Sequence, residues 1–124
     1  MDTSSSKLMR STESLFFSII LPTYNRSYII GETIKSVINQ TYDKWELIII
    51  DDFSSNYPEK IIDEFKHNQI RFYKCNNSNN IARSRNFGIK KSNNDWIAFL
   101  DSDDVWDKEK LFEVQKSIIK DNPD

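Results

Sequence analysis

Two aspartates separated by one residue are the sharpest chemical feature of this sequence. Asp101 and Asp103 flank Ser102 directly after an apolar run that ends at Leu100. Two carboxylates on an extended turn can present oxygen atoms to one hard cation, and Mg²⁺ and Mn²⁺ prefer such ligands and share them with phosphates. The alternative is a solvated acidic loop that caps the next helix. An Asp-x-Asp pair considered alone favours this alternative, because the pattern is common. The position directly after a buried strand shifts the balance toward a metal site.

Residues that could bind a nucleotide follow two other apolar runs and open a predicted helix. The Asp52 carboxylate could accept a hydrogen bond from a nucleobase N–H, as uracil would offer, or could simply form a turn. Tyr24 could stack on a nucleobase or pack at the edge of the core. Arg83 and Arg85 could neutralise a diphosphate or face solvent, and their helical spacing lets only one of them serve. The residue types alone leave these choices open.

The chemistry-bearing residues are separated by apolar runs that alternate with segments of helical periodicity. Runs typical of β-strands cover 16–21, 45–50, 70–75 and 96–100. Helices are predicted from Ser27 onward, around 58–65, over 81–91, and after Asp107 as a cap. This β-α-β-α-β-α-β-α order predicts an α/β fold, in which parallel strands form one Rossmann-like sheet with flanking helices. The first, second and fourth runs are continuously apolar, which predicts that both faces of these strands are covered.

The predicted topology brings the polar residues together. In an open parallel sheet, ligands bind at the carboxyl edge of the strands. Thr23, Asp52 and Asp101 each follow one of the predicted strands, and Arg85 lies near the start of a predicted helix. We therefore expect these residues to meet at one rim of the sheet.

The composition restricts the classes of protein to which the chain can belong. Its 124 residues fit one domain, with residues 1–14 predicted as a flexible leader and 15–124 as the folded part. The net charge of −2 gives no basic face for binding nucleic acid. Only two glycines are present, which excludes a Walker loop and a dinucleotide fingerprint. No apolar run approaches the roughly 20 residues that cross a bilayer.

The chain has one cysteine, Cys75, and one histidine, His67. A single cysteine excludes an internal disulfide and a cysteine zinc site, and it fits a reducing, cytoplasmic setting. His67 has no sequence neighbours that would complete a catalytic triad or a ligand set, so we expect it to be exposed and structural.

Four segments taken together resemble family 2 glycosyltransferases, which have the GT-A fold. They read Ser-Ile-Ile-Leu-Pro-Thr-Tyr-Asn-Arg at 18–26, Ser-Val-Ile-Asn-Gln-Thr-Tyr at 36–42 continued by Trp-Glu-Leu-Ile-Ile-Ile-Asp-Asp-Phe-Ser at 45–54, Ala-Arg-Ser-Arg-Asn-Phe-Gly-Ile at 82–89, and Trp-Ile-Ala-Phe-Leu-Asp-Ser-Asp-Asp-Val-Trp at 96–106. The resemblance runs from about residue 16 to the end of the chain. It implies that the chain is the N-terminal, nucleotide-sugar-binding part of such an enzyme.

The resemblance also implies roles for individual residues. Asp103 would be the direct ligand of a Mn²⁺ or Mg²⁺ ion, with Asp101 holding the ribose or assisting the cation. Asp52 would contact the base and Tyr24 would pack on it, while Arg85 matches the arginine of the family motif. The remaining donor-binding residues by this resemblance are Pro22, Thr23, Asn25 and Ser102. Asn80 stands where the family often has a glycine, and asparagine tolerates the left-handed backbone expected there.

The implied reaction is an inverting, metal-dependent sugar transfer of the hexosyltransferase type, as used in polysaccharide biosynthesis. The donor would be a nucleotide sugar, with a UDP-sugar expected, and the acceptor a saccharide or a lipid-linked molecule. The catalytic base of the family lies in a later acceptor-side segment and is expected beyond Asp124. A truncated C-terminus is therefore expected, with a missing C-terminal half or a partner chain covering an exposed sheet edge. The full enzyme would be cytoplasmic, at the inner membrane face.

Two other functions fit some of the same residues. The chain could be a non-catalytic nucleotide-sugar-binding module or one half of a split enzyme. A phosphotransfer or phosphatase domain could also use Asp101 and Asp103, but such folds usually place their nucleophile after the first strand. Thr23, Tyr24 and Asn25 occupy that place here, so this third function is disfavoured.

Overall fold

The computed structural model describes residues 15–56 and 58–121, and within them it contains every strand and helix predicted from the sequence. In chain order these are β1 (Phe17–Thr23), α2 (Ser27–Ile38), β2 (Trp45–Asp51), α3 (Pro58–Phe65), β3 (Ile70–Lys74), α4 (Ile81–Lys91), β4 (Trp96–Phe99) and α5 (Lys110–Asp121). The alternating order is therefore confirmed. The predicted leader, residues 1–14, lies outside the described residues.

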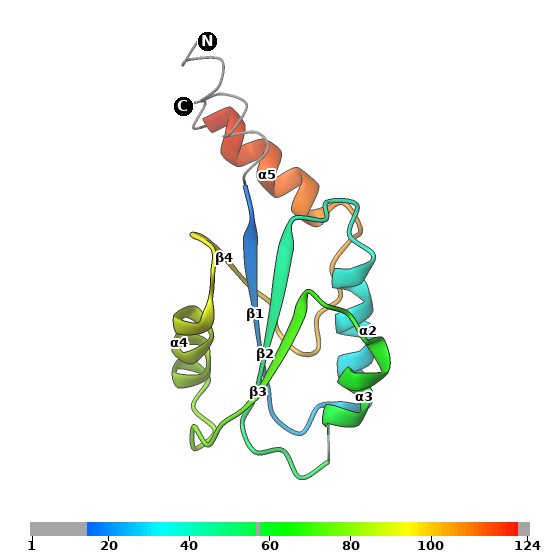
Figure 1. The fold of residues 1–124 in the computed structure, drawn as a ribbon, viewed down its shortest axis with the longest axis vertical. Helices are drawn as coiled ribbons and strands as arrows, with labels where there is room; N and C mark the ends of the chain where they lie inside the picture. Colours follow the sequence, from blue (N-terminus) through cyan, green and yellow to red (C-terminus); the bar gives the residue numbers. More distant parts are fainter. Residues whose placement is uncertain (1–14, 57, 122–124) are drawn as a thin grey trace.

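The four strands form one sheet in the order β3-β2-β1-β4, and all neighbouring strands are parallel (Figure 1). The chain builds the sheet outward from β1 through β2 to β3 and then returns to place β4 on the other side of β1. This reversal makes the junction of β1 and β4 the switch point at which ligands bind in such sheets. The register pairs Thr23 with Asp51, so the loops after β1 and β2 leave the sheet together.

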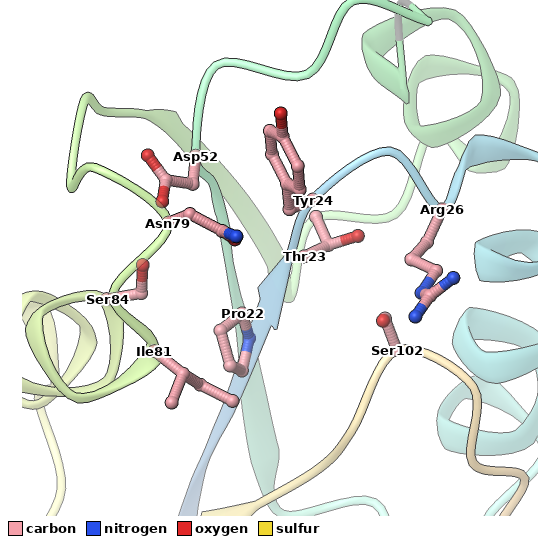
Figure 2. A pocket seen from close by; sticks show the side chains of 9 residues that line it. All are labelled: Pro22, Thr23, Tyr24, Arg26, Asp52, Asn79, Ile81, Ser84 and Ser102. Atoms are coloured by element: carbon pink, nitrogen blue, oxygen red, sulfur yellow. The ribbon is translucent and has the colours of Figure 1, made fainter.

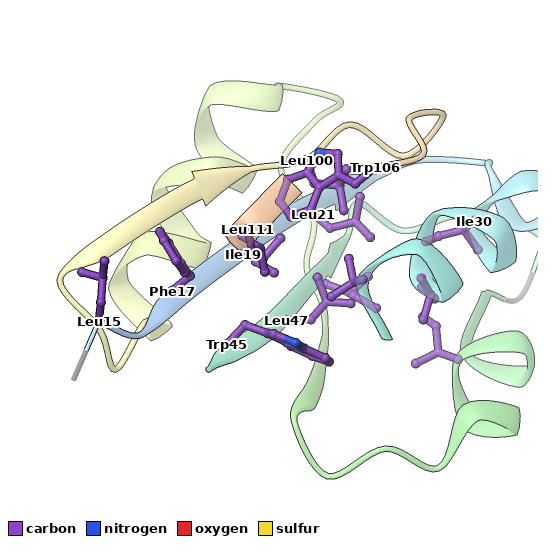
Figure 3. Packing of buried hydrophobic residues seen from close by; sticks show 14 residues of the cluster. Leu15, Phe17, Ile19, Leu21, Ile30, Trp45, Leu47, Leu100, Trp106 and Leu111 are labelled. Atoms are coloured by element: carbon purple, nitrogen blue, oxygen red, sulfur yellow. The ribbon is translucent and has the colours of Figure 1, made fainter. Parts of the chain in front are cut away.

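Helices cover the two faces of the sheet unequally. Helices α2 and α3 lie on one face and α4 on the other, as Figure 1 shows. Alternate residues of β1 follow this division: Ile19 and Leu21 belong to the larger core, while Ile20 packs with Ile48 and Ile50 toward α4. The larger core also contains aromatic and aliphatic side chains from the strand starts and from the segment after β4 (Figure 3).

Helix α4 approaches the sheet closely because it carries Gly88 on its inner face. A Cβ atom on Gly88 would lie 2.6 Å from Cγ2 of Ile20 and 2.8 Å from Cδ1 of Ile50. No side chain fits in that space without displacement. The glycine that lowers the helix propensity of 81–91 is thus the residue that lets this helix pack.

The prediction that both faces of the fourth strand are covered is wrong. Trp96 and Phe99 of β4 are 40% and 48% exposed, whereas β1 is buried throughout. The difference arises because β4 lies at the edge of the sheet and β1 lies inside it. An apolar run alone does not tell an edge strand from a central one.

Two local expectations also need correction. Asn80 is not left-handed but extended, with φ of −101°, and its side chain caps α4 by accepting a hydrogen bond from the Arg83 amide. In the turn before α4, the left-handed residues are Ser78 and Asn79, with φ of 54° and 57°. Asp107 accepts a hydrogen bond from the Glu109 amide at 2.9 Å, but in a turn that precedes α5 rather than at its first residue.

None of the helices within the described residues has both the length and the apolar character needed to cross a bilayer.

Candidate functional site

The loops after β1 and β2 are hydrogen-bonded to each other at the carboxyl edge of the sheet. The Asp52 amide donates to the Thr23 carbonyl at 3.0 Å. The Asn25 amide donates to Oγ of Ser54 at 2.7 Å, and the side-chain oxygen of Asn25 accepts from the Ser55 amide at 2.9 Å. Asn25 adopts a positive φ of 53°, which an asparagine tolerates. Its side chain therefore holds the two loops together and does not line the cavity described below.

Asp51 and Asp52 are adjacent but have different environments. Asp51 is completely buried, and its two carboxylate oxygens accept hydrogen bonds from the amide and the hydroxyl of Ser54. Asp52 is 6% exposed, and its Oδ1 accepts a hydrogen bond from the Asn77 amide at 2.6 Å. The second oxygen of Asp52 has no hydrogen-bond partner among the described residues. Of these two carboxylates, therefore, that of Asp52 is the one that can accept a hydrogen bond from a ligand.

A cavity of about 280 Å³ opens beside Asp52, near the lower end of the roughly 300–1,000 Å³ typical of ligand pockets. Figure 2 shows its walls, which come from the loops after β1, β2 and β4 and from the start of α4. Of the residues predicted from the sequence, it is lined by Pro22, Thr23, Tyr24, Asp52 and Ser102. The loops predicted to meet at one rim thus do so.

Four lining residues were not predicted as site residues: Arg26, Asn79, Ile81 and Ser84. Asn79 owes its place to the left-handed turn before α4, and Ser84 lies one turn into that helix, where its hydroxyl accepts from the Asn77 side chain at 3.0 Å. Ser84 falls inside the 82–89 motif, which was the available signal for it. Arg26 follows Asn25 directly, but the sequence gives no sign of which way its side chain points.

The wall of the cavity contains one buried polar atom without a hydrogen-bond partner among the described residues that line it, Oγ1 of Thr23. Its side chain is 5% exposed, and Oγ1 is buried without a hydrogen bond among the described residues. In Figure 2 this hydroxyl lies on the side of Arg26 and Ser102. Buried hydroxyl groups are nearly always hydrogen-bonded in native proteins, to protein, water or ligand. The Thr23 hydroxyl is therefore available to a bound molecule.

The predicted metal-binding residues lie on the turn after β4, next to the cavity. The Asp104 amide donates to the Asp101 carbonyl at 3.0 Å and closes this turn. Asp101 and Asp103 are exposed and do not line the cavity, whereas Ser102 between them does. Asp103 has no ion pair or side-chain hydrogen bond with the described residues. Its carboxylate is therefore free to bind a cation.

Arg85 lies beside this turn. Its guanidinium is 3.4 Å from Oδ1 of Asp101 and sits 5.1 Å above the centroid of the Phe99 ring. Both partners of the ion pair are well exposed, so the pair contributes little stability and does not lock Asp101 in place. The amide of Arg83, the other candidate, donates a hydrogen bond to Oδ1 of Asn80, and Arg83 does not line the cavity.

The carboxylates fit a cation that keeps part of its own hydration or shares ligands with a phosphate. The described residues contain no cluster of three or more His, Cys, Asp or Glu side chains of the kind that alone encloses a metal. Mg²⁺ and Mn²⁺ are typically held by one or two carboxylates together with substrate phosphates and water. Two exposed carboxylates on one turn, those of Asp101 and Asp103, are compatible with a site of that kind.

Cys75 and His67 do not contribute to the site. Burial, followed by the negative charge of Asp52, raises the pKa of the Cys75 thiol, so it stays protonated at neutral pH and is a poor nucleophile. His67 is half-buried rather than exposed, stacks on Trp45 at 5.2 Å between ring centroids, and accepts a hydrogen bond from the Gln69 amide. Its packing against Trp45 is consistent with the expected structural role.

Comparison with known proteins shows clear similarities. The family model described as Glycosyl transferase family 2 matches residues 18–124. A curated relative from Escherichia coli, the UDP-Glc:alpha-D-GlcNAc-diphosphoundecaprenol beta-1,3-glucosyltransferase WfgD, is 40% identical over 105 residues. The match covers 85% of this chain and 41% of that protein, so the chain spans less than half the length of this relative.

Solved structures of two further proteins illustrate the same arrangement. S. aureus TarS 1–349 superposes with a TM-score of 0.78 at 27% identity, covering 86% of this chain and 32% of that one, and a second TarS structure contains UDP-GlcNAc. The mannosyltransferase PcManGT of Pyrobaculum calidifontis, in complex with GDP-Man and Mn²⁺, superposes with a TM-score of 0.71. At 16% identity, with 88% of this chain and 37% of that one covered, this second likeness concerns the fold alone.

Proposed function

This chain belongs to glycosyltransferase family 2 and has the GT-A fold, and we propose that it supplies the donor and metal site of an inverting, metal-dependent sugar transfer. The observation that carries this proposal is the cavity at the sheet edge, where Asp52, Tyr24 and the unpartnered Thr23 hydroxyl lie beside the turn of Asp101 and Asp103. The cavity thus offers a carboxylate oxygen and an aromatic ring to a nucleobase, and the turn beside it offers carboxylates to a cation.

We propose that the donor is a UDP-sugar. The free oxygen of Asp52 can accept the hydrogen bond that N3–H of uracil offers, and the half-exposed Tyr24 ring can pack on the base. The Thr23 hydroxyl can bind a polar group of the nucleoside. A relative named for UDP-Glc and a TarS structure that contains UDP-GlcNAc support the same class of donor.

Asp103 and Asp101 would hold a Mn²⁺ or Mg²⁺ ion, and Arg85 would place a fixed positive charge beside them. When bound, such an ion neutralises negative charge that grows on the departing diphosphate. Asp103 is free for this role, and the exposed Arg85–Asp101 pair can rearrange at little cost. The remaining donor-binding residues, Pro22, Asn25 and Ser102, would shape the wall and hold the loops.

In the proposed reaction, an acceptor hydroxyl oxygen forms a bond to the anomeric carbon as the bond from that carbon to the diphosphate oxygen breaks. The electron pair leaves with the nucleoside diphosphate, and the proton of the hydroxyl passes to a carboxylate base. We propose that this base belongs to a part of the enzyme beyond Asp124, because curated relatives are much longer than this chain. We propose that the full enzyme transfers a hexosyl group to a saccharide or a lipid-linked acceptor, and that it does so at the inner membrane face.

A second function is a binding module that works only with another polypeptide segment. Trp96 and Phe99 are exposed on opposite faces of the edge strand β4, and we propose that a segment from a partner chain or from a C-terminal half covers this edge. This function shares the donor site and differs only in catalysis. A turnover assay on the full-length polypeptide that carries this sequence separates the two, because only the first function predicts sugar transfer without a partner chain.

Calorimetric titration with UDP, in Mn²⁺ and again in a chelator, tests the donor and metal site. We expect UDP to bind in Mn²⁺ and to lose about tenfold in affinity when the metal is removed. Asp103→Ala should show the weaker affinity in both conditions. Equal UDP affinity with and without metal in the wild-type chain would contradict the metal assignment, and rapid sugar transfer by the chain alone would contradict the proposal that the base lies beyond Asp124.

A further inference from the structure

Helix α2 and the turn that follows it carry a stripe of polar residues that are buried although they lie beside the hydrophobic core. Thr33, Ser36 and Gln40 are spaced as i, i+3 and i+7, and they are 1%, 7% and 7% exposed. Buried polar side chains of this kind need hydrogen-bond partners, since an unpaired one destabilises the fold. The partners of this stripe therefore indicate what it does.

The stripe is bonded to the segment that follows β4. Oγ1 of Thr33 donates to the carbonyl oxygen of Ser102 at 2.8 Å. At the other end of the stripe, the Gln40 side chain donates to the Asp107 carbonyl at 2.6 Å and accepts from the Leu111 amide at 2.9 Å. Helix α2, through Thr33, and the turn after it, through Gln40, thus hold both ends of the segment that carries Asp101 and Asp103.

The bond from Thr33 is the important one for the acidic turn. Within the described residues, the turn 101–104 makes only one other side-chain hydrogen bond or ion pair to another element, the exposed Arg85–Asp101 pair. The Ser102 carbonyl belongs to the peptide that joins Ser102 to Asp103, so fixing it restrains the backbone next to Asp103 directly and next to Asp101 through Ser102. The Thr33 hydroxyl is a rigid donor, because its side chain is β-branched and packed in the core.

We propose that Thr33 is a positioning residue that holds the Asp101–Asp103 turn in the geometry needed to bind a divalent cation against the donor diphosphate. This inference rests on the proposed function and adds a residue that touches neither substrate nor metal. The base-binding side of the cavity is held differently, through the Asp52 amide and the Asn77 amide. Loss of the Thr33 bond should therefore affect metal-dependent binding and leave base binding unchanged.

Three forms of the full chain test the inference: wild type, Thr33→Val and Thr33→Ser. Valine keeps the shape and removes the donor, while serine keeps the donor. Titration with UDP in Mn²⁺ should show about tenfold weaker binding for Thr33→Val and near wild-type binding for Thr33→Ser. Titration with uridine in a chelator should give the same affinity for all three within about twofold.

Two results would overturn the positioning role. One is an unchanged Mn²⁺-dependent UDP affinity in Thr33→Val, and the other is a loss of uridine affinity that parallels the loss of UDP affinity, which indicates general damage to the fold. Failure of the wild-type chain to bind UDP in a metal-dependent way would instead refute the proposed function.

If the wild-type chain does not bind UDP in a metal-dependent way, amide hydrogen exchange measured by NMR still tests whether Thr33 holds the turn. The Asp104 amide is protected by its bond to the Asp101 carbonyl within the turn. Thr33→Val should speed its exchange about tenfold relative to wild type, and Thr33→Ser should restore it. Unchanged exchange in Thr33→Val would show that Thr33 does not hold the turn.

Discussion

Asp51 and Asp52 are neighbours in the chain, but their side chains have different surroundings. Asp51 ends β2 and is buried, whereas Asp52 lines the cavity. Asp51 turns inward, where Ser54 satisfies both of its carboxylate oxygens. Asp52 turns to the cavity with one oxygen bound by the Asn77 amide and the other free. One is a structural residue of the β2–α3 loop, and the other is the candidate contact for a nucleobase.

This division predicts opposite phenotypes for two conservative substitutions. Asp51→Asn should destabilise the fold by about 1–3 kcal/mol, because both carboxylate oxygens of Asp51 accept from Ser54 and asparagine has only one acceptor oxygen. Asp52→Asn should leave the free energy of unfolding within about 1 kcal/mol of wild type and weaken UDP binding about tenfold. Urea denaturation and calorimetry measure the two effects. A stable Asp51→Asn that binds UDP poorly would reverse the assignments.

At the scale of the elements, the two glycines of the chain lie in helices and differ only in their surroundings. A Cβ on Gly31 in α2 would lie 3.7 Å from Ile61, an ordinary contact, whereas a Cβ on Gly88 in α4 would press into Ile20 and Ile50. Neither glycine has a positive φ. Helix propensity therefore favours alanine at both positions, and packing opposes it at one.

Gly31→Ala should stabilise the protein by about 0.5–1 kcal/mol, since alanine is the better helix former and has room. Gly88→Ala should instead cost about 1–3 kcal/mol, because the added methyl group overpacks the contact between α4 and the sheet. Denaturant unfolding of the two variants beside wild type gives both values. Stabilisation by both alanines would show that α4 packs more loosely on β1 and β2 than the structure has it.

The elements are also joined at the amino edge of the sheet, opposite the cavity, by the side chain of Glu46. It accepts hydrogen bonds from Ser18 of β1 at 2.5 Å, from Arg71 of β3 at 2.6 Å and from the Asn93 amide at 2.7 Å. Burial raises the pKa of Glu46, but the bonds from Ser18, Asn93 and Arg71 and the charge of Arg71 outweigh it, so the pKa is lowered.

A lowered carboxyl pKa makes a stability contribution that is present above the ordinary value of 4.5 and is lost as the pH falls through the folded-state value. Glu46→Gln should therefore lower the free energy of unfolding by about 2 kcal/mol at pH 7 and by much less at pH 3. Glu64→Gln, at an exposed position of α3, serves as the control. Urea unfolding across this pH range tests it, and a difference between Glu46→Gln and wild type that does not shrink in acid would contradict it.

For the whole molecule, sequence patterns predicted the order of elements and the edge at which the site lies. Apolar runs and helical periodicity are local properties of the sequence, so they were sufficient to predict β1, β2 and the helices that follow them, α2 and α3. The exposure of β4 depends on strand order, and the bond from Thr33 to Ser102 joins residues 69 positions apart. Neither is encoded in a local pattern. The same holds for Arg26 and Asn79, which reach the cavity only through the loop geometry.

Because the cavity is built from loops after β1, β2 and β4, a ligand that bridges them should stabilise the fold as one unit. Ligand at 100 times its Kd adds about 2.7 kcal/mol to the free energy of unfolding, which corresponds to a rise in Tm of about 10 °C or more for a domain of this size. We expect UDP with Mn²⁺ to produce this rise in wild type at far lower UDP concentration than in Asp103→Ala. Uridine alone should need the same concentration in both proteins, since Asp103 does not line the cavity. Thermal unfolding over a UDP series measures the shift. Identical UDP curves for the two proteins in Mn²⁺ would show that Asp103 and the nucleotide cavity do not act as one site.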